Sequence, residues 1–267
     1  MAGGFRSPPK VLRRLRLTRQ VAREVRSWPS FMYHYAFGFV PRSAYVFRNG
    51  ARLKISRGVD HASILEVFLK HDYGHIPDSS VILDVGASTG VFSIYAAHNA
   101  RDVKLYAYEP SGPCFDVLQE NVRLNGLEGI VTCVKAALAS DNDEHVLFTE
   151  GTGFFFPTLV APGSEAEDVQ TASTQGTTLT NMLASNCLER VDVLKLDIEG
   201  GEYEGLYATP RETFDRISAI RMEYHNLDEE QRNVTALKQF LGAQGYRIIM
   251  ERPTSATNGN LWAERDA

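Results

Sequence analysis

The chain has 267 residues, of which 43% are apolar and 23% charged, so it has room for one large globular α/β domain with an extension. Its net charge of −5 argues against a general nucleic-acid binder, and its three cysteines are far apart and form no C-x-x-C pair, which argues against a disulfide framework or a structural zinc site. The sequence shows neither an apolar run long enough to cross a membrane nor the apolar core of a secretion signal, so we expect a cytoplasmic protein.

Residues 1–42 form a predicted N-terminal extension whose charge differs from that of the rest of the chain. Residues 1–30 carry eight basic residues and one acid, a charge of +7, which leaves about −12 for the remainder. Helical spacing of apolar residues predicts a basic amphipathic helix over residues 11–26, and an aromatic run follows at residues 31–40. We favour an extension that packs on the main domain with its arginines in water; the alternative is peripheral contact of residues 10–40 with a lipid-linked acceptor or the inner face of a membrane.

The main domain, residues 43–267, is predicted to begin with a β-hairpin. Residues 46–55 alternate in polarity around Asn49-Gly50, a residue pair typical of a tight hairpin turn. A short helix over residues 63–70 then leads into the first core strand. From there the chain alternates strand and helix, which predicts a parallel sheet with helices on both faces.

The stretch 81–90 predicts a buried strand, a glycine turn and the start of a helix at residues 91–97. Gly86 and Gly90 let the backbone turn sharply and let a ligand approach it, and the helix start supplies free N–H groups. Asp84 stands at the end of the strand, where a carboxylate would repel a pyrophosphate but attract a cationic or zwitterionic ligand. The sequence therefore predicts a cofactor site at this turn.

A second acid follows the next predicted strand, residues 104–108. Glu109 comes about 20 residues after the glycines, where dinucleotide folds place the acid that binds the ribose hydroxyls. The glycine spacing here is G-x-x-x-G, not the dinucleotide G-x-G-x-x-G. These features suit S-adenosylmethionine better than NAD. Ala136, which follows a predicted strand at residues 131–134, is a candidate wall for the adenine ring.

Residues 138–180 interrupt the regular alternation. A strand is predicted at residues 146–148, followed by an apolar, glycine-flanked segment at residues 151–157 and an acidic stretch rich in Ser, Thr and Gly. Two interpretations are open: an insertion with a mobile loop that partly covers the site, or a solvated connector.

The remaining predicted elements complete the alternation and close the sheet. They are a helix at residues 113–125, a short helix at 178–183, strands at 191–197 and 218–225, a helix at 228–241, and an antiparallel hairpin of residues 246–251 and 260–263.

Polar residues collect at the carboxyl ends of these predicted strands, where ligands of open α/β sheets bind. Methyl transfer to a hydroxyl requires in-line positioning and removal of the hydroxyl proton. His225 is the candidate base, and Glu223 or Asp197 is expected to orient it or to bind the acceptor. A purely structural histidine is the alternative. A third interpretation is that Asp197, Glu223 and His225 hold Mg²⁺, which would acidify the hydroxyl.

Several segments together resemble one known family. They are Asp84-Val-Gly-Ala-Ser-Thr-Gly90, Tyr108-Glu109-Pro110, Asn121 with Asn125, the Thr-Thr-Leu-Thr segment at residues 177–180, and Lys195-Leu-Asp-Ile-Glu-Gly-Gly-Glu202. Over about residues 45–250 the chain is similar to the FkbM-type family of class I methyltransferases. The resemblance implies a Rossmann-like sheet, S-adenosylmethionine as cofactor, and O-methylation of hydroxyls on sugar, glycan, glycolipid or polyketide-type acceptors.

The resemblance also implies roles for individual residues. It assigns the methionine part of the cofactor to Asp84, Gly86 and Gly90, and the ribose to Glu109, with Asp197 facing both donor and acceptor. Ala87 and Ser88 belong to the same cofactor turn. Ser88 stands where the family usually has Asn, and a serine can still bind a carboxylate or turn the backbone.

A different class of enzyme matches the same turn. Gly86-Ala-Ser88-Thr-Gly90 fits the G-x-S-x-G nucleophile elbow of α/β-hydrolases, and Ser88, Asp197 and His225 occur in the order of a catalytic triad. Too few strands precede the turn for that fold, and Asp84 and Glu109 would then have no role. A non-catalytic binding module is a further alternative. We expect a small-molecule or glycan acceptor and no nucleic acid; the acceptor's identity and the oligomeric state are open.

Overall fold

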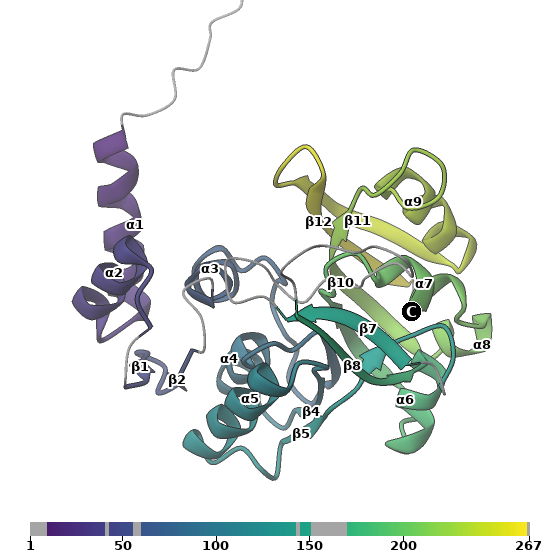
Figure 1. Ribbon diagram of the computed structural model, residues 1–267, viewed down its shortest axis with the longest axis horizontal. Coiled ribbons are helices and arrows are strands. Elements are labelled where there is room, and N and C mark those ends of the chain that lie inside the picture. Colours follow the sequence, from purple (N-terminus) through teal and green to yellow (C-terminus); the bar gives the residue numbers. More distant parts are fainter. Residues whose placement is uncertain (1–9, 41–42, 56–59, 143–144, 151–169, 266–267) are drawn as a thin grey trace, which may run out of the picture.

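The structure is a computed structural model that describes residues 10–40, 43–55, 60–142, 145–150 and 170–265. Within these residues the main sheet has seven strands (Figure 1). In spatial order they are β11 (Tyr246–Pro253), β12 (Asn258–Arg265), β10 (Ile217–His225), β9 (Val191–Leu196), β3 (Val81–Val85), β4 (Lys104–Tyr108) and β5 (Val131–Val134). β12 runs antiparallel to both of its neighbours and the others share one direction. The predicted mostly parallel sheet with a closing antiparallel hairpin is confirmed.

The order of the strands reverses at β3. From β3 the chain builds outward through β4 and β5 to one edge, and then through β9 and β10 toward the other. Such a reversal opens a crevice at the carboxyl ends of the two strands on either side of it. Here those strands are β3 and β9, whose last paired residues are Val85 and Leu196.

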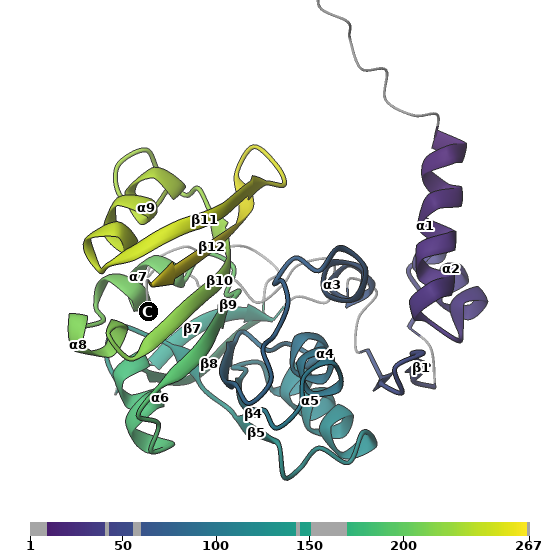
Figure 2. The same ribbon diagram turned by 180° about the vertical axis from the view of Figure 1, so that it is seen from behind.

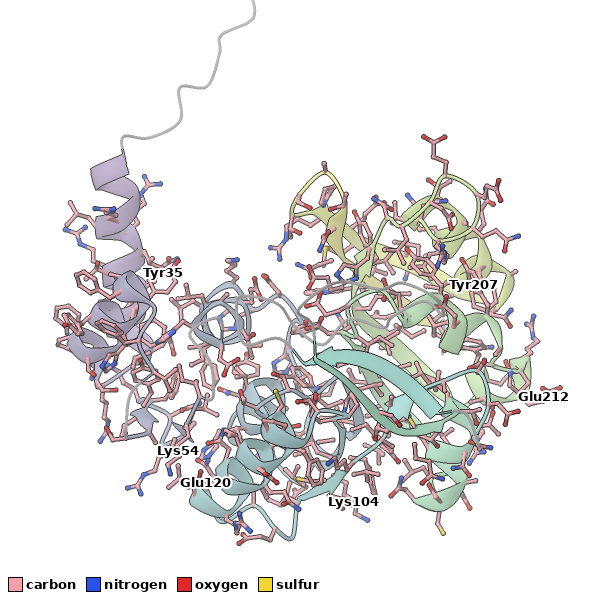
Figure 3. All side chains as sticks on the ribbon, viewed as in Figure 1. Tyr35, Lys54, Lys104, Glu120, Tyr207 and Glu212 are labelled. Carbon is pink, nitrogen blue, oxygen red and sulfur yellow. The ribbon has the colours of Figure 1, made fainter. Side chains whose placement is uncertain are left out.

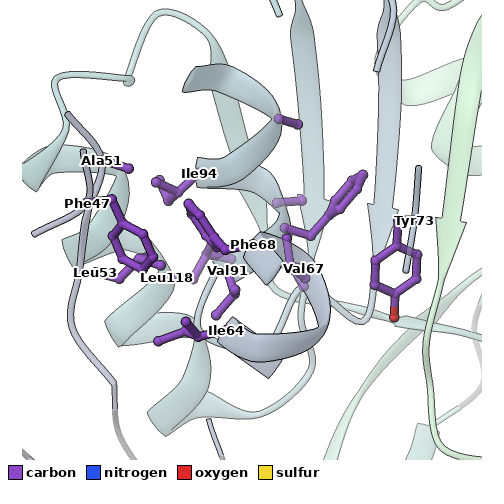
Figure 4. Packing of buried hydrophobic residues seen from close by; sticks show 14 of the residues in the cluster. Phe47, Ala51, Leu53, Ile64, Val67, Phe68, Tyr73, Val91, Ile94 and Leu118 are labelled. Atoms are coloured by element: carbon purple, nitrogen blue, oxygen red, sulfur yellow. The ribbon is translucent and has the colours of Figure 1, made fainter. Parts of the chain in front are cut away.

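Helices cover both faces of the sheet, as predicted (Figures 1 and 2). The first face packs against α3 (Asp60–Ile64), the π-helix η1 (Leu65–Lys70), α4 (Val91–Asn99) and α5 (Gly112–Leu124), and the second against α6 (Leu179–Ser185), α7 (Glu202–Tyr207), α8 (Arg211–Phe214) and α9 (Val234–Ala243). Alternation along β3 sends Ile82 into the first cluster and Leu83 and Val85 into the second. Figure 4 shows the first cluster, in which the rings of Phe47 and Phe68 stack with centroids 4.0 Å apart.

The N-terminal extension consists of α1 (Lys10–Glu24) and α2 (Trp28–Phe37), which stand at one end of the molecule (Figures 1 and 2). The predicted basic helix is confirmed, whereas the aromatic run, for which no helix was predicted, is itself helical. Val21, Val25 and Phe31 are fully buried in the first cluster. Packing therefore crosses the predicted boundary at residue 42, and the extension does pack on the main domain. Within the described chain, the structure offers no helix with the length and apolarity needed to span a membrane.

The predicted hairpin is present as β1 (Tyr45–Val46) and β2 (Arg52–Leu53), joined by the turn at Asn49-Gly50. It lies against α1, because the backbone of Val25 bridges to that of Phe47.

The segment predicted as an insertion contributes a small sheet of its own. Its described strands are β6 (Ala137–Leu138), β8 (Gln170–Thr177) and β7 (His145–Glu150), in that spatial order. Residues 151–169, which include the apolar segment 151–157 and the loop expected to cover the site, lie outside the described residues. Whether this insertion covers the site stays a prediction.

One predicted helix begins later than expected. The prediction placed its start at Asp228, but α9 starts at Val234, where the Asn233 side chain accepts the backbone N–H groups of Thr235 and Ala236. Asp228 instead closes a turn, because one of its carboxylate oxygens accepts the backbone N–H groups of residues 230–232. A short acidic side chain that can bond its own downstream backbone favours a turn over a helix interior.

Candidate functional site

The glycine turn between β3 and α4 is packed against the end of β9. Gly86 has a φ of +80°, and a Cβ on it would lie 1.9 Å from the backbone oxygen of Asp197. Gly90 has a φ of +85°, and its Cβ would lie 2.6 Å from a methyl of Leu118. Both positions therefore require glycine, for backbone angle and for space. Ser88 between them also has a left-handed φ, 50°.

A buried ion pair supports this turn. Asp84 and Lys195 are register partners on β3 and β9, are 0% and 3% exposed, and lie 3.1 Å apart from Oδ1 to Nζ. Ser93 donates to the other oxygen of Asp84 at 2.6 Å, and Lys195 Nζ donates to the backbone oxygen of Gly86 at 2.6 Å. Burial alone would lower the pKa of Lys195, but Asp84 and Asp197 raise it above its ordinary value. Lys195 is therefore charged.

This pairing corrects the expectation for Asp84. Asp84 does not line the cavity described below, and its carboxylate is occupied by Ser93 and Lys195. It supports the turn through Lys195 and does not present a free carboxylate to a ligand.

Glu109 is held at the end of β4 by backbone donors. Its two carboxylate oxygens accept the N–H groups of Ser88 at 2.7 Å and of Ser111 at 2.8 Å. The carboxylate is thus tied to the glycine turn, beside the place where the spacing predicts a ribose.

A cavity of about 880 Å³, counted to its open mouth, lies at the carboxyl ends of β3, β4 and β9. Six of the predicted cofactor residues line it: Gly86, Ala87, Ser88, Glu109, Ala136 and Asp197. Gly90 does not line the cavity; its left-handed backbone conformation forms part of the turn. Pro110, Ala137 and Leu138 add an apolar wall beside Ala136. An apolar wall, a carboxylate at the strand tip and a turn with no room for a Cβ fit the adenine, ribose and methionine parts of S-adenosylmethionine.

Carboxylates gather at the side of the cavity away from that wall. Tyr73 donates its hydroxyl to Asp197 Oδ2 at 2.8 Å, and Lys195 Nζ lies 3.8 Å from the same oxygen. Burial, followed by Asp197, raises the pKa of Tyr73 well above its ordinary value, so Tyr73 stays a donor. Glu66 on η1 lines the same cavity. Burial raises the pKa of Glu66 to about 7; Lys70 opposes this shift and Asp197 adds to it.

His225 has a different environment from the one expected. Glu202 Oε1 lies 3.0 Å from its Nδ1 and accepts its backbone N–H at 2.8 Å, while Glu199 Oε2 lies 3.3 Å from its Nε2. Burial alone would lower the pKa of His225, but the contacts with Glu199 and Glu202 raise it to about 10. His225 does not line the cavity, and neither Asp197 nor Glu223 contacts its ring nitrogens as expected. An imidazolium between two carboxylates does not fit a general base at neutral pH.

The structure also differs from the expectation that Glu223 and its neighbours hold a metal ion. Burial, followed by Asp197, raises the pKa of Glu223 to about 8, with His225 opposing. In the part of the chain that the structure describes, no group of three or more His, Cys, Asp or Glu residues is arranged to hold a metal ion. Asp197, Glu223 and His225 therefore do not form the Mg²⁺ site that the sequence suggested as one interpretation.

The hydrolase alternative also requires residues that the structure keeps apart. Ser88 and Asp197 line the cavity, but both ring nitrogens of His225 face Glu199 and Glu202. The backbone N–H of Ser88 is donated to Glu109. Ser88, Asp197 and His225 thus do not form a nucleophile–base–acid chain.

Sequence reasoning missed Glu66 and Tyr73 as cavity residues. Both precede the core strand, and only the tertiary fold brings them to Asp197. Lys195 left a signal, because a lysine between Leu194 and Leu196 in a buried strand must find a buried partner. Its partner, Asp84, lies between Leu83 and Val85 of the neighbouring strand β3.

Comparisons with known proteins agree with this geometry. The family model described as the methyltransferase FkbM domain matches residues 84–248. The chain is 25% identical over 215 residues to methyltransferase sdnD of Sordaria araneosa, covering 70% of this chain and 82% of that protein. It is 23% identical over 209 residues to the 31-O-demethyl-FK506 methyltransferase FkbM of Streptomyces tacrolimicus, covering 69% and 79%.

Among solved structures, magnesium protoporphyrin IX methyltransferase (ChlM) from Synechocystis PCC 6803 with bound SAM aligns over 98% of this chain and 87% of that chain, at 12% identity and a TM-score of 0.41. The family model spans more than half of this chain, including the glycine turn, Glu109 and the β9 segment. The protein therefore belongs to the FkbM-domain family and is an S-adenosylmethionine-dependent methyltransferase.

Proposed function

We propose that the protein methylates a hydroxyl oxygen of a sugar, glycan, glycolipid or polyketide-type acceptor. One observation carries this proposal: two carboxylates, Asp197 and Glu66, line the same cavity as the glycine turn and Glu109. Carboxylates accept hydrogen bonds from hydroxyls and can take their protons. The name of the FkbM relative, a 31-O-demethyl-FK506 methyltransferase, supports oxygen as the methylated atom.

The two carboxylates are suited to different tasks. Tyr73 and Lys195 fix the position of Asp197, so Asp197 is proposed to accept the hydrogen bond of the acceptor hydroxyl and to aim its oxygen. Glu66, whose pKa burial raises to about 7, is proposed to take the proton, because a base that titrates near the working pH transfers protons most effectively. S-Adenosylmethionine supplies, when bound, a methyl group on a positively charged sulfur.

His225 is proposed to act indirectly. Glu199 lines the cavity and contacts His225 Nε2 at 3.3 Å, so the buried imidazolium holds Glu199 in place. His225 is then a positioning residue.

Cofactor binding and acceptor chemistry are tested separately. Calorimetric titration of S-adenosylhomocysteine into the wild type and Glu109→Ala is expected to give binding that weakens by about tenfold or more in the variant, through the lost ribose contact. Incubation with ¹³C-methyl-labelled cofactor and a panel of hydroxyl, amine and thiol acceptors follows, read by NMR. A methoxy carbon on a sugar or polyketide-type compound supports the proposal; methylation confined to nitrogen or sulfur overturns it.

A further inference from the structure

The end of the molecule formed by α1 and α2 exposes a cluster of apolar side chains. The aromatic patch, as we name it, consists of Trp28, Tyr33, Tyr35, Phe37, Phe39 and Val40, each more than a third exposed. Phe37 and Phe39 are 63% and 52% exposed, and the rings of Tyr33, Phe37 and Phe39 lie within 5.0–6.1 Å of one another. The rings of Tyr33, Phe37 and Phe39 are thus contiguous, and an exposed apolar group of this kind marks a surface that contacts something apolar.

Positive charge lies on α1, the helix that contacts α2, and on the link between the two helices. The arginine row, as we name it, comprises the exposed side chains of Arg14, Arg16, Arg19, Arg23 and Arg26. Glu24 is the one acid among residues 10–40 of the sequence. The chain as a whole carries −5, so its positive charge is concentrated at the end where its aromatic side chains are exposed. Basic residues beside exposed aromatic rings match the two layers of a bilayer surface, anionic headgroups over hydrocarbon.

A groove at this end has one lining residue in common with the cofactor cavity. It runs between α1 and η1 and is lined by Arg14 and Arg16 of the arginine row, Tyr35 of the aromatic patch, and Glu66. Tyr35, labelled in Figure 3, has its ring centroid 6.2 Å from that of His61 on α3. Glu66 lines both the groove and the cofactor cavity. A molecule held in the groove thus lies beside the carboxylate that also faces the donor site.

We propose that the α1–α2 end docks on an anionic lipid bilayer, so that a lipid-borne acceptor enters through the groove. A second copy of the chain is a poorer occupant, because a two-fold contact through the patch would bring two arginine rows together. The acidic remainder of the chain is repelled by the same headgroups, which orients the protein on the surface. Docking stands independently of the reaction, whereas the lipid-borne acceptor rests on the proposed function.

The test is co-sedimentation of the full chain with vesicles of phosphatidylcholine alone or mixed with phosphatidylglycerol, at low and high salt. The wild type is expected to bind the mixed vesicles and to be released by salt. Phe37→Ser/Phe39→Ser and Arg16→Glu/Arg19→Glu are each expected to lower the partition coefficient by about tenfold or more. Matched controls are Leu227→Ser/Ile249→Ser, two exposed apolar residues elsewhere, and Lys104→Glu/Arg123→Glu, which has the same charge change.

The outcomes separate docking from catalysis. S-Adenosylhomocysteine binding by every variant shows that the fold and donor site are intact, so loss of vesicle binding alone then reports the surface. The proposal is overturned if the wild type stays in the supernatant, if it binds neutral vesicles equally well, or if the controls lose as much binding. It is also overturned if light scattering shows a dimer that Phe37→Ser/Phe39→Ser dissociates while vesicles have no effect.

Discussion

Lys195 and Asp84 form an ion pair in the middle of the sheet, where both charges are almost completely removed from water. Such a pair contributes little net stability compared with apolar residues, but removing one partner leaves the other charge buried and unpaired. Lys195 also donates to the backbone oxygen of Gly86. The pair therefore links the shape of the cofactor turn to β9, and its loss should affect both stability and binding.

Replacing the lysine tests this link. Lys195→Met is expected to lower the free energy of unfolding by about 3–5 kcal/mol in urea titrations, because Asp84 loses its counter-charge. Lys104→Met, an exposed lysine on the neighbouring strand β4, is the matched control and should change stability little. Asp84→Asn/Lys195→Met should recover part of the loss. Equal losses in the single and double variants would contradict the role assigned to the pair.

Glu66 allows a kinetic test at the residue scale. If Glu66 takes the acceptor proton, activity should rise as this carboxyl deprotonates, with a midpoint near its pKa of about 7. Glu66→Gln should lower kcat by about a hundredfold or more and remove this rise from the pH profile. S-Adenosylhomocysteine affinity should be nearly unchanged. A variant that keeps the wild-type pH profile would exclude Glu66 as the base.

At the scale of elements, Asn121 of α5 and Asn125, which caps the end of that helix, bond the backbone of β2 and of the residue after it. Asn121 Oδ1 accepts the backbone N–H of Lys54, and its Nδ2 lies at hydrogen-bond distance from the backbone oxygens of Lys54 and Thr89. Asn125 binds the backbone N–H and oxygen of Arg52 in the same way. These contacts hold the hairpin and the glycine turn against one helix, and explain physically why both asparagines belong to the segments that resemble the family.

The glycine turn gives the sharpest prediction for an element. Gly86→Ala should destabilise the fold by at least about 3 kcal/mol and abolish S-adenosylhomocysteine binding, because the backbone must move away from Asp197. Gly126→Ala is the matched control, since Gly126 also has a positive φ but its added Cβ would meet nothing within 4 Å. Gly126→Ala should lower the free energy of unfolding by about 1 kcal/mol. Similar effects from the two would show that backbone angle alone, and not the close approach, constrains Gly86.

The elements that could be predicted are those whose signal is local. Apolar runs predicted the core strands, and the Asn49-Gly50 pair predicted the hairpin. The glycine spacing together with Glu109 predicted the cofactor turn. The helix α2 was missed because aromatic residues have weak helix propensity and its stability comes from burial of Phe31. The partners of His225 were missed because Glu199 and Glu202 lie beyond the end of β9, in another part of the chain. Which acid reaches which base is set by tertiary packing.

At the scale of the whole molecule, three groups that titrate between about pH 7 and pH 10 in the folded state hold their protons more tightly there than in the unfolded chain. Burial raises the pKa of Glu66 to about 7 and of Glu223 to about 8, from 4.5, and contacts with Glu199 and Glu202 raise that of His225 to about 10, from 6.5. A proton bound more tightly when folded stabilises the fold below the unfolded pKa, and this contribution is lost as pH rises through the folded pKa. These three groups should therefore make the fold more stable in mild acid than in alkali.

Urea unfolding measured from pH 5 to pH 10 checks this. The wild-type free energy of unfolding should fall with rising pH, and His225→Gln should lose the part of the slope between pH 6.5 and about pH 10. His75→Gln, an exposed histidine, is the control and should keep the wild-type slope. A His225→Gln slope equal to that of the wild type would show that the imidazolium gains nothing from its two glutamates.

The π-helix η1 has one more consequence, which concerns insertions and deletions. A π-turn encloses one residue more than an α-turn, and here that surplus residue lies in the segment that carries Glu66. Deleting Leu69 would let the segment wind as an α-helix while the chain on either side keeps its orientation, because a π-turn holds its extra residue without rotating its flanks. The length of this segment can thus change by one residue, whereas the same deletion inside the α-helix α5 would rotate the rest of that helix by about 100°.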